Sequence, residues 1–339
     1  MSTAPIHQPP NDVELLEECA RATDELRRQV ARVIVGQDEV VDACLVTLLC
    51  RGHALLVGVP GLAKTFLVAA LARALSLSFG RVQFTPDLLP ADITGTDVLS
   101  ELELEGRVRR EVRFMPGPIF ANLVLADEIN RTPPKTQAAL LQAMQERQVT
   151  VGGVTHPLPD PFQVFATRNP IEQEGTYPLP EAQVDRFMLK VVVDYPRPDE
   201  ERLIIERMTG NPLPPVTPVV GPEQILHARD IVRRVYVDEK IKNYVLDLVL
   251  TTRNPGNNGL SDLRPFIAYG ASPRAGINLI LAARAHAFVK GRGFVTPDDV
   301  KEVAPDVLRH RIIVSYEAEA ESVSSADIVQ RILDYAEVP

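Results

Sequence analysis

A short apolar run that leads into a glycine-containing turn constrains the fold of this chain more than any other feature. Residues 54–57, with the sequence ALLV, have the composition of a strand that is buried on both faces of a parallel sheet. The turn GVPGLAKT follows at residues 58–65, and the apolar periodicity of residues 66–75 then indicates a helix. This succession of strand, turn and helix is the arrangement that a phosphate-binding loop requires.

The chemistry of the turn suits a polyphosphate ligand. Backbone N–H groups of the turn and of the first helical turn point at one small volume, where the helix dipole adds partial positive charge. We expect Lys64 to reach the β- and γ-phosphates and the Thr65 hydroxyl to bind Mg²⁺. Nucleotide binding is assigned to the whole turn, which comprises Gly58, Val59, Pro60, Gly61, Leu62, Ala63, Lys64 and Thr65.

One position departs from the usual pattern, because Ala63 stands where a second glycine is common. An alanine adds only a methyl group and can keep a helical φ, so we expect the loop to form. The alternative is an ordinary strand-to-helix turn with a chance Lys-Thr pair. The strand before the turn and the helix after it favour the phosphate-binding interpretation.

Length, charge and cysteine content limit the class of protein. At 339 residues the chain is long enough for two domains with separate cores. Its net charge of -9, without an evident cluster of lysine and arginine, argues against a dedicated nucleic-acid surface. Cys19, Cys44 and Cys50 lie in apolar helical stretches without metal-binding spacing, which indicates buried thiols in a reducing compartment. No run is apolar enough to span a bilayer and no signal peptide is evident, so we expect a cytoplasmic protein.

A second chemical landmark is an apolar run that ends in two adjacent carboxylates. Residues 123–126, LVLA, are followed by Asp127 and Glu128. The carboxyl ends of parallel strands form the edge where ligands bind in open α/β sheets. Because successive strand residues point to opposite sides, we expect Asp127 to contact Mg²⁺ through water and Glu128 to polarise the attacking water. Acids at strand ends are often merely solvated, and the pairing with Lys64 and Thr65 is what favours catalysis.

Two further features have competing interpretations. Asn169 follows the apolar run at 162–167 and precedes Pro170, so it either hydrogen-bonds a γ-phosphate or the attacking water, or starts a turn. Taken alone, the feature favours the turn. Val35 and Gly36 separate two helical patterns, where they either let the backbone approach a flat ligand such as a base or form a simple turn.

The remaining pattern divides the chain into three parts. Residues 1–32 are predicted to be a tail, disordered over residues 1–10, and a helix. Residues 33–195 are predicted to form a nucleotide-binding core, and residues 196–339 a mostly helical domain. Within the core we expect an irregular insertion with hairpin-like pieces at 93–118.

Short segments complete this prediction. Residues 148–154 alternate in polarity and contain Gly152 and Gly153, which indicates a hairpin. A proline-rich linker is predicted at 211–222. After it, three stretches each have the periodicity of one helix, namely 223–252, 273–290 and 297–310.

Taken together, these motifs resemble the AAA+ ATPases, and most closely the MoxR family, in the branch that also contains magnesium chelatase subunits and MCM helicases. The resemblance covers the chain from about residue 33 to the C-terminus. It is carried by GVPGLAKT at 58–65, LVLADEINR at 123–131, TPPKTQAALLQAMQERQVTV at 132–151, ATRNP at 166–170, LPEAQVDRFML at 179–189 and SPRAGINLI at 272–280. Alanine at position 63 is usual in that family, whereas Arg168 stands where a glutamine is expected.

The resemblance implies an α/β fold of the P-loop NTPase type, an αβα sandwich with a five-stranded parallel sheet, followed by a mostly helical lid domain. It matches Arg186 to the arginine finger that reaches the γ-phosphate of a neighbouring subunit. The alternative is a surface arginine paired with Asp185, which would stabilise the chain little. Arg131 also lies in a matched motif, but an ordinary surface role is the favoured interpretation.

Arg274 is matched to the second sensor of the family, on the lid. This residue also has independent physical support. Ser272 is predicted to be an N-cap and Pro273 the first helical residue, so the Arg274 cation lies in a first turn, where it opposes the helix dipole. A cation placed against local preference suggests an anionic partner.

In function, the resemblance implies ATP and Mg²⁺ as ligands and a homo-oligomeric ring, expected to be a hexamer, with ATP at its subunit interfaces. It implies a chaperone-like role, in which hydrolysis tilts the lid and helps a client mature or take up a metal cofactor, typically with a partner that carries a von Willebrand factor A domain. A nucleic-acid motor of the MCM type is the second possibility, and the acidic charge balance argues against it. A nucleotide switch that scarcely hydrolyses is the third, and Glu128 with Arg186 argues against that.

Overall fold

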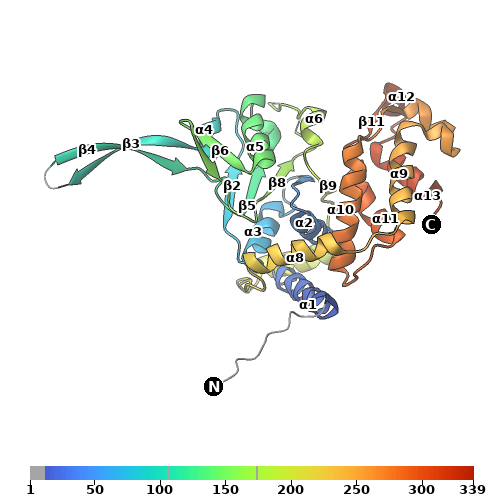
Figure 1. The fold of residues 1–339 in the computed structure, drawn as a ribbon, viewed down its shortest axis with the longest axis horizontal. Coiled ribbons are helices and arrows are strands. Elements are labelled where there is room, and N and C mark those ends of the chain that lie inside the picture. Colours follow the sequence, from blue (N-terminus) through green and yellow to red (C-terminus); the bar gives the residue numbers. More distant parts are fainter. Residues whose placement is uncertain (1–11, 105–106, 173–174) are drawn as a thin grey trace, which may run out of the picture.

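A five-stranded parallel sheet with the order β2-β5-β8-β1-β9 forms the centre of the computed structural model (Figure 1). The structure describes residues 12–104, 107–172 and 175–339, so the predicted disordered tail lies outside the described residues. The strands are β1 (Ala54–Val57), β2 (Phe79–Gln83), β5 (Leu123–Asp127), β8 (Gln163–Arg168) and β9 (Leu189–Val192). The predicted α/β fold with a parallel five-stranded sheet is therefore confirmed.

Helices cover both faces of this sheet (Figure 1). Leu56 and Leu125 share a core with the helices of one face, and the preceding residues Leu55 and Val124 share a core with those of the other. Because successive strand residues point to opposite faces, a strand covered on both sides contains few polar residues, as the sequence of residues 54–57 indicated. The main covering helices are α2 (Asp38–Leu49) and α3 (Lys64–Ala74) on the first face and α5 (Pro134–Glu146) on the second.

The register of the parallel strands aligns their carboxyl ends. Ala126 on β5 lies opposite Ala166 on β8, and Leu56 on β1 lies opposite Thr167 on β8. Asp127, Thr167 and the turn that follows β1 therefore leave the sheet at one edge, where open α/β sheets bind ligands.

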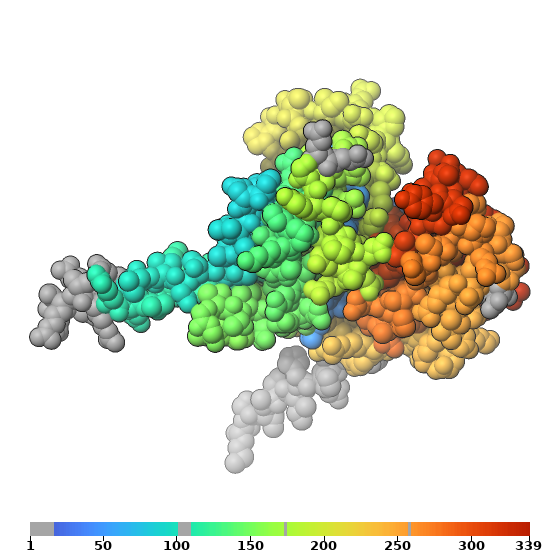
Figure 2. All heavy atoms as spheres, turned by 90° about the horizontal axis from the view of Figure 1, so that it is seen from above, coloured from blue at the N-terminus to red at the C-terminus, as the bar shows by residue number. Residues whose placement is uncertain are grey.

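A long antiparallel hairpin projects from the sheet region (Figures 1 and 2). It consists of β3 (Gly95–Leu104) and β4 (Arg107–Pro116). The insertion predicted at 93–118 is correctly located, but it is a regular hairpin rather than an irregular segment. A hairpin without a covering layer buries few side chains, so both strands are rich in charged residues even though polar and apolar residues alternate at 101–104. Such a composition is difficult to tell from that of a loop. Leu99 and Val112, which are cross-strand partners, are 59% and 64% exposed.

The shorter predicted hairpin is also present. It is formed by β6 (Gln148–Val151) and β7 (Val154–Pro157), which pair antiparallel. Gly152 and Gly153 join the strands with φ values of 56° and 83°. Two consecutive positive φ values are what a tight two-residue hairpin turn requires, and glycine adopts them without strain.

A mostly helical region follows the sheet along the chain (Figure 1). The prediction of one helix over 223–252 is wrong, because a break separates two helices there. Asp238 caps the second helix by accepting a hydrogen bond from the Lys240 N–H, and Tyr236 pairs with Phe294 in an isolated bridge. The elements are α7 (Pro198–Thr209), α8 (Pro222–Arg234), α9 (Glu239–Arg253), β10 (Ile267–Tyr269), α10 (Pro273–Val289), α11 (Pro297–Leu308), β11 (Ile313–Val314), α12 (Tyr316–Ala320) and α13 (Ser325–Tyr335). None of the helices in the described ranges combines the length and apolarity needed to cross a bilayer.

The first helix of this region, α8, is tied to the sheet region. Arg229 on α8 is only 2% exposed, and its Nε donates to Leu48 O on α2 at 2.9 Å. Its Nη1 donates to Asp160 Oδ1 at 3.0 Å. The predicted boundary between residues 33–195 and 196–339 therefore lies within a region of continuous packing, and the division into domains stays a prediction.

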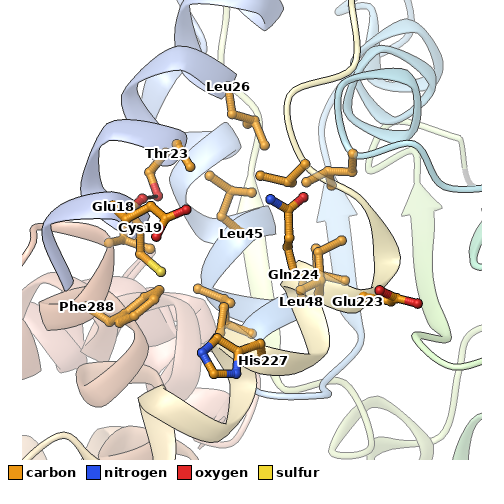
Figure 3. Close-up of a pocket in the computed structure, with 17 residues that line it drawn as sticks. Glu18, Cys19, Thr23, Leu26, Leu45, Leu48, Glu223, Gln224, His227 and Phe288 are labelled. Carbon is orange, nitrogen blue, oxygen red and sulfur yellow. Dashed lines mark hydrogen bonds between the residues drawn. The ribbon is translucent and has the colours of Figure 1, made fainter. Parts of the chain in front are cut away.

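The N-terminal helix α1 (Asp12–Ala31) packs where the sheet region and the helical region meet (Figure 1). Leu26 and Val30 of α1 belong to a core that also includes residues of α2, α8 and α10. An apolar cavity of about 310 Å³ remains between these four helices (Figure 3). Cys19, Leu45 and Phe288 are among its lining residues, and Figure 3 shows them converging from α1, α2 and α10.

The three cysteines are free thiols. Cys44 is buried, as predicted, whereas Cys19 and Cys50 are half-buried. Burial raises the pKa of Cys50 to about 12, so this side chain stays a neutral thiol at physiological pH. The three thiols therefore behave as packing side chains rather than reactive groups.

A buried histidine links three elements of the sheet region. His53 Nδ1 accepts a hydrogen bond from the Val164 N–H at 2.9 Å, and its Nε2 donates to Met144 O at 3.1 Å. These bonds join the start of β1 to β8 and to the end of α5. Burial lowers the pKa of His53 to about 4, because the charged form would lose its hydration.

We expect His53 to make stability depend on pH. As pH falls from about 6.5 to about 4, the unfolded chain binds a proton on this residue before the folded chain does, so the free energy of unfolding decreases by up to about 3 kcal/mol. Denaturant titrations at about pH 7 and about pH 5 measure how much of this stability is lost between the two pH values. We expect the loss to be about 2 kcal/mol smaller in His53→Gln than in the wild-type protein. His227→Gln, at an exposed histidine, is the matched control. An equal acid-induced loss in wild type and His53→Gln would contradict the assignment.

Candidate functional site

The turn at residues 58–65 closes over a small concave volume at the edge of the sheet. Gly58 has no room for a side chain, since a Cβ there would lie 2.5 Å from Val193 O at the end of the neighbouring strand. Gly61 has a φ of +88°, a conformation that L side chains rarely adopt. The shape of the loop thus requires glycine at these two positions, for close approach at the first and for backbone conformation at the second.

Ala63 is in a left-handed conformation, with φ 53° and ψ 22°. The prediction that this alanine keeps a helical φ is therefore wrong, and α3 begins directly after it at Lys64 rather than at Phe66. A non-glycine residue in this conformation costs roughly 1–2 kcal/mol. Such strain is characteristic of functional loops that the surrounding structure holds in place.

The Lys64 ammonium folds back over the loop. Its Nζ donates to the carbonyl oxygens of Gly58 and Val59, each at 2.7 Å. Burial lowers the pKa of Lys64, and the nearby carboxylates of Asp127 and Glu128 oppose this shift. The lysine, both acids and the loop therefore share one electrostatic environment.

Three side chains hold Asp127 at the end of β5. Thr65 Oγ1 donates to Asp127 Oδ2 at 3.3 Å, and Thr167 Oγ1 donates to Oδ1 at 2.7 Å. Arg81 Nη2, on the adjacent strand β2, donates to Oδ2 at 2.7 Å. The structure thus brings together Thr65 and Asp127, the two residues predicted to hold a metal ion.

Glu128 has a left-handed backbone conformation, with a φ of 58°, directly after β5. Its N–H donates to Thr167 Oγ1 at 2.8 Å. Its carboxylate accepts a hydrogen bond from Gln83 Nε2 at 3.0 Å and pairs with Arg131 Nη1 at 3.2 Å. The side chains of Asp127 and Glu128 therefore have different partners, although both line the same cavity, and the separate roles expected from strand alternation stay a prediction.

Asn169 has the turn-forming role, and its predicted bond to a γ-phosphate or to the attacking water stays a prediction. Its Oδ1 accepts a hydrogen bond from the Ile171 N–H at 3.2 Å, which is the turn-forming role. Its Nδ2 is buried and has no hydrogen-bond partner among the described residues. A buried donor without a partner costs free energy, so this amide is suited to a ligand that supplies an acceptor.

These side chains line one cavity of about 350 Å³. The residues that line it are Pro60, Gly61, Leu62, Ala63, Lys64, Thr65, Phe66, Asp127, Glu128, Thr167 and Asn169. Backbone N–H groups, an ammonium, two carboxylates and a free amide donor therefore converge on a volume that a polyphosphate fits.

The donor atoms also fit a hydrated Mg²⁺. Thr65 Oγ1 and Asp127 Oδ2 lie 3.3 Å apart, and Mg²⁺ prefers oxygen donors while keeping several of its waters. Arg81 already occupies one side of the Asp127 carboxylate. This arrangement supports the predicted contact through water rather than direct ligation by Asp127.

Val35 and Gly36 lie beside the loop but are not among the residues that line this cavity. The neighbouring Gln37 donates its Nε2 hydrogen to Leu62 O at 3.2 Å. Gly36 has a φ of +69°, a conformation that favours glycine, and a Cβ there would also lie 2.4 Å from the carboxylate of Glu200 on α7. Contact with a base stays a prediction for Val35 and Gly36.

Arg186 and Arg274 lie in a second cavity, of about 390 Å³, which shares no lining residue with the first. Asp185 pairs with Arg274 at 2.8 Å and with Arg311 at 2.7 Å. The alternative that Arg186 pairs with Asp185 is therefore wrong. Arg186 is exposed, and its side chain makes no hydrogen bond or ion pair within the described part of the chain, whereas its backbone N–H donates to Gln183 O at 3.2 Å. Ser272 is the N-cap of α10, as predicted.

The sequence did not indicate three residues of the first site. Thr167 bridges the two acids, and the signal that could have found it is a polar residue at the end of an otherwise apolar strand. Arg81 has no local signal, because its partner lies on a strand distant in sequence. Arg131, expected to be an ordinary surface residue, pairs with both Glu128 and Glu172.

The apolar cavity between α1, α2, α8 and α10 is chemically unlike either of these sites (Figure 3). Its lining is mainly aliphatic, and its charged members are the acids Glu18 and Glu223. Among the described residues that line it there is no lysine or arginine, so it is unsuited to phosphate.

Known proteins share these features. Residues 53–189 match a family model described as the ATPase family associated with various cellular activities (AAA), and residues 261–332 match an AAA lid domain. The chain is 46% identical over 339 residues to "Chaperone MoxR1" of Mycobacterium tuberculosis. This match covers 100% of this chain and 88% of that protein. It is 36% identical over 312 residues to "Protein MoxR" of Paracoccus denitrificans, covering 87% of this chain and 90% of that protein.

A solved structure resembles the whole chain. It is a putative ATPase from Cytophaga hutchinsonii, with a TM-score of 0.88 and 44% sequence identity. The match covers 96% of this chain and 97% of that one. The sheet, the loop and the helical region therefore occur together in a protein of closely similar architecture.

We expect Thr167 to stabilise the folded site through its hydroxyl. Thr167→Val keeps the shape of the side chain but removes the bonds to Asp127 and Glu128, which should lower the free energy of unfolding by about 1–3 kcal/mol. Thr155→Val, at an exposed strand position on β7, is the matched control and should change stability little. Denaturant unfolding compares the two variants, and equal stabilities would contradict the bridging role.

Proposed function

The chain belongs to the MoxR family of AAA+ ATPases, and on that basis we propose that it hydrolyses ATP at the interfaces of a ring of identical copies, in our proposal a hexamer. Family membership makes the protein an ATP-hydrolysing enzyme with chaperone relatives. The observation that supports the proposed chemistry is the convergence of Lys64, Asp127, Glu128 and Asn169 on one cavity. The segment containing Gly36, beside the loop, would contact the base.

In the proposed reaction, water attacks the γ-phosphorus of ATP, the bond between that phosphorus and the bridging oxygen of ADP breaks, and inorganic phosphate leaves. The Glu128 carboxylate accepts the proton of the attacking water. Lys64 neutralises charge on the terminal phosphates, and Asn169 Nδ2 donates to the γ-phosphate or to the water. When bound near Thr65 and Asp127, Mg²⁺ supplies further neutralisation of the developing charge.

The positions of two arginines support hydrolysis between copies. Neither Arg186 nor Arg274 lines the phosphate cavity of its own chain, and both line the second cavity. Arg186 is also exposed, which an arginine that contacts another copy requires. We therefore assign Arg186 as the finger and Arg274 as the second sensor, both acting on the ATP of a neighbour.

The projecting hairpin supports a role in remodelling a partner. Leu99 and Val112 form an exposed apolar pair on β3 and β4, and neither lines the phosphate cavity. Figure 2 shows how far this hairpin projects. Exposed apolar side chains on a projecting element are suited to contact with another protein. In the proposed cycle, the helical region moves relative to the sheet region on hydrolysis and the hairpin transmits that motion to a client. The client matures or takes up a metal cofactor, together with a partner that carries a von Willebrand factor A domain.

Glu128→Gln tests the catalytic assignment. The amide cannot accept the proton, so kcat should fall by roughly 100-fold or more while ATP binding is retained. A coupled phosphate-release assay and equilibrium binding of a fluorescent ATP analogue measure the two quantities. Glu206→Gln, on an exposed face of α7, is the control for loss of one carboxylate. Wild-type turnover in Glu128→Gln would refute the assignment.

Hydrolysis at interfaces predicts that activity depends on assembly. The specific activity of the wild-type protein should rise with protein concentration, because dilution separates each ATP from the arginine of the neighbour. Arg186→Gln should stay at least roughly 100-fold less active at every concentration. Turnover measured alongside light scattering provides the comparison. Concentration-independent wild-type activity over the range in which the ring dissociates would be inconsistent with a site shared between copies.

A further inference from the structure

The second cavity contains more positive charge than one arginine finger and one sensor require. Four arginines line it, Arg51, Arg147, Arg186 and Arg274, and none of its described lining residues is acidic. The net charge of the whole chain is -9, so this concentration of cations is a local property. Guanidinium groups that share one volume repel one another unless an anion lies between them.

Arg51 and Arg147 have no carboxylate partner within the described part of the chain. Arg147 Nη2 donates to Arg51 O at 3.2 Å, and Arg51 Nε is buried without a partner. The nearest opposing charge, Asp160, already pairs with the buried Arg229 at 3.0 Å. Arg229 also repels both arginines electrostatically. Arg274 pairs with Asp185, and Asp160 acts on Arg147 without forming an ion pair with it. Within the described part of the chain, Arg51 and Arg147 are therefore left without a carboxylate in contact.

The backbone presents these two arginines in strained conformations. Arg51 directly follows the C-cap of α2 with a φ of 57°, and Arg147 is the C-cap of α5 with a φ of 54°. Glycine is the residue that these left-handed positions favour. A hydrogen bond from the Arg147 N–H to Ala143 O and one from the Leu158 N–H to Arg147 O fix the backbone on both sides. A long cationic side chain at a position where glycine would be less strained indicates that the side chain has a function.

His53 connects the end of α5, where Arg147 lies, to the sheet. Its Nε2 donates to Met144 O in the last turn of α5, three residues before Arg147, and its Nδ1 accepts from the Val164 N–H on β8. His53 itself lines the second cavity. The position of Arg147 is therefore coupled to the sheet that carries the phosphate loop.

From this geometry we propose that Arg147, supported by Arg51, binds the terminal phosphates of the ATP held by a neighbouring copy. The inference rests on the proposed hydrolysis between copies and adds two ligands to that site. No arginine is among the described residues that line the phosphate cavity, whereas the second cavity has arginines and no phosphate loop, so the two are complementary halves. A triphosphate has enough negative charge to compensate several guanidinium groups, and their planar forks match phosphate oxygens.

Arg147→Gln tests this inference in the full-length protein. Turnover should fall roughly 10- to 100-fold, because one donor to the transition-state phosphate is lost. Arg202→Gln removes an equal charge from an exposed face of α7 and should leave turnover unchanged. Arg147→Gly is a second variant whose backbone strain is relieved, so it should be at least as stable as wild type in thermal unfolding and yet as inactive as Arg147→Gln. Wild-type turnover in Arg147→Gly would overturn the proposal.

Mixed assemblies show whether Arg147 acts on a neighbour or within its own chain. Lys64→Ala has a defective phosphate loop and intact arginines, whereas Arg147→Gln has the reverse. Lys64→Ala should be inactive alone and Arg147→Gln strongly impaired, and equimolar mixtures should regain turnover well above the mean of the two. If Arg147 bound a free anion or served only the fold of its own chain, mixing would restore nothing, and that result would overturn the proposal.

A parallel mixture separates this inference from the proposed function. Arg186→Gln mixed with Lys64→Ala tests hydrolysis between copies by itself. Recovery in that mixture without recovery in the Arg147→Gln mixture would refute the role of Arg147 and leave interface hydrolysis standing. Failure of both mixtures would refute both. Recovery in both is the expected result.

Discussion

The parallel pairing of β5, β8 and β1 is the constraint on which the whole site depends. It places the end of β8 between the acids that follow β5 and the loop that follows β1. One hydroxyl at that position, on Thr167, then bonds the Asp127 carboxylate and the Glu128 N–H together. A slip of the register by one residue would turn this hydroxyl to the opposite face and separate the acids. The catalytic geometry is therefore a consequence of how the core of the sheet packs.

The sequence predicted the features that depend on local chemistry. The apolar run before Gly58 and the acids after residue 126 each identified a strand end, and the Lys64-Thr65 pair identified the loop that follows the first of them. The structure brings all three to one edge of the sheet. Contacts between distant segments could not be found this way. Arg81 meets Asp127 only because β2 and β5 are neighbours, and neither local sequence contains that information.

Local backbone conformation was the second limit of prediction. The left-handed φ of Ala63 was not predicted, because alanine ordinarily favours a right-handed helix, although the glycine common at this position of the pattern is a signal for it. The break between α8 and α9 was missed for a similar reason: the apolar period continues across it, while the cap at Asp238 and the pairing of Tyr236 interrupt the helix. In both places the tertiary environment outweighs local preference.

The two cavities differ in the charge of the side chains that line them. Carboxylates and a phosphate loop belong to one cavity, and arginines belong to the other. A surface of this kind is complementary to a second copy in a head-to-tail arrangement, which closes into a ring when the rotation between copies permits. In the ring that we propose, bound nucleotide would lie between these cavities, so it would be part of the subunit contact as well as the substrate.

The apolar cavity between α1, α2, α8 and α10 affects how easily the side chains around it can move. Side chains that border an empty volume lack dispersion contacts on one side, so they can shift there at a smaller enthalpic cost than in a close-packed interior. This free volume lies where α1, α2, α8 and α10 meet, between the sheet and the helices that follow it. The cavity therefore leaves the side chains at this contact more room to shift than residues of the close-packed core have.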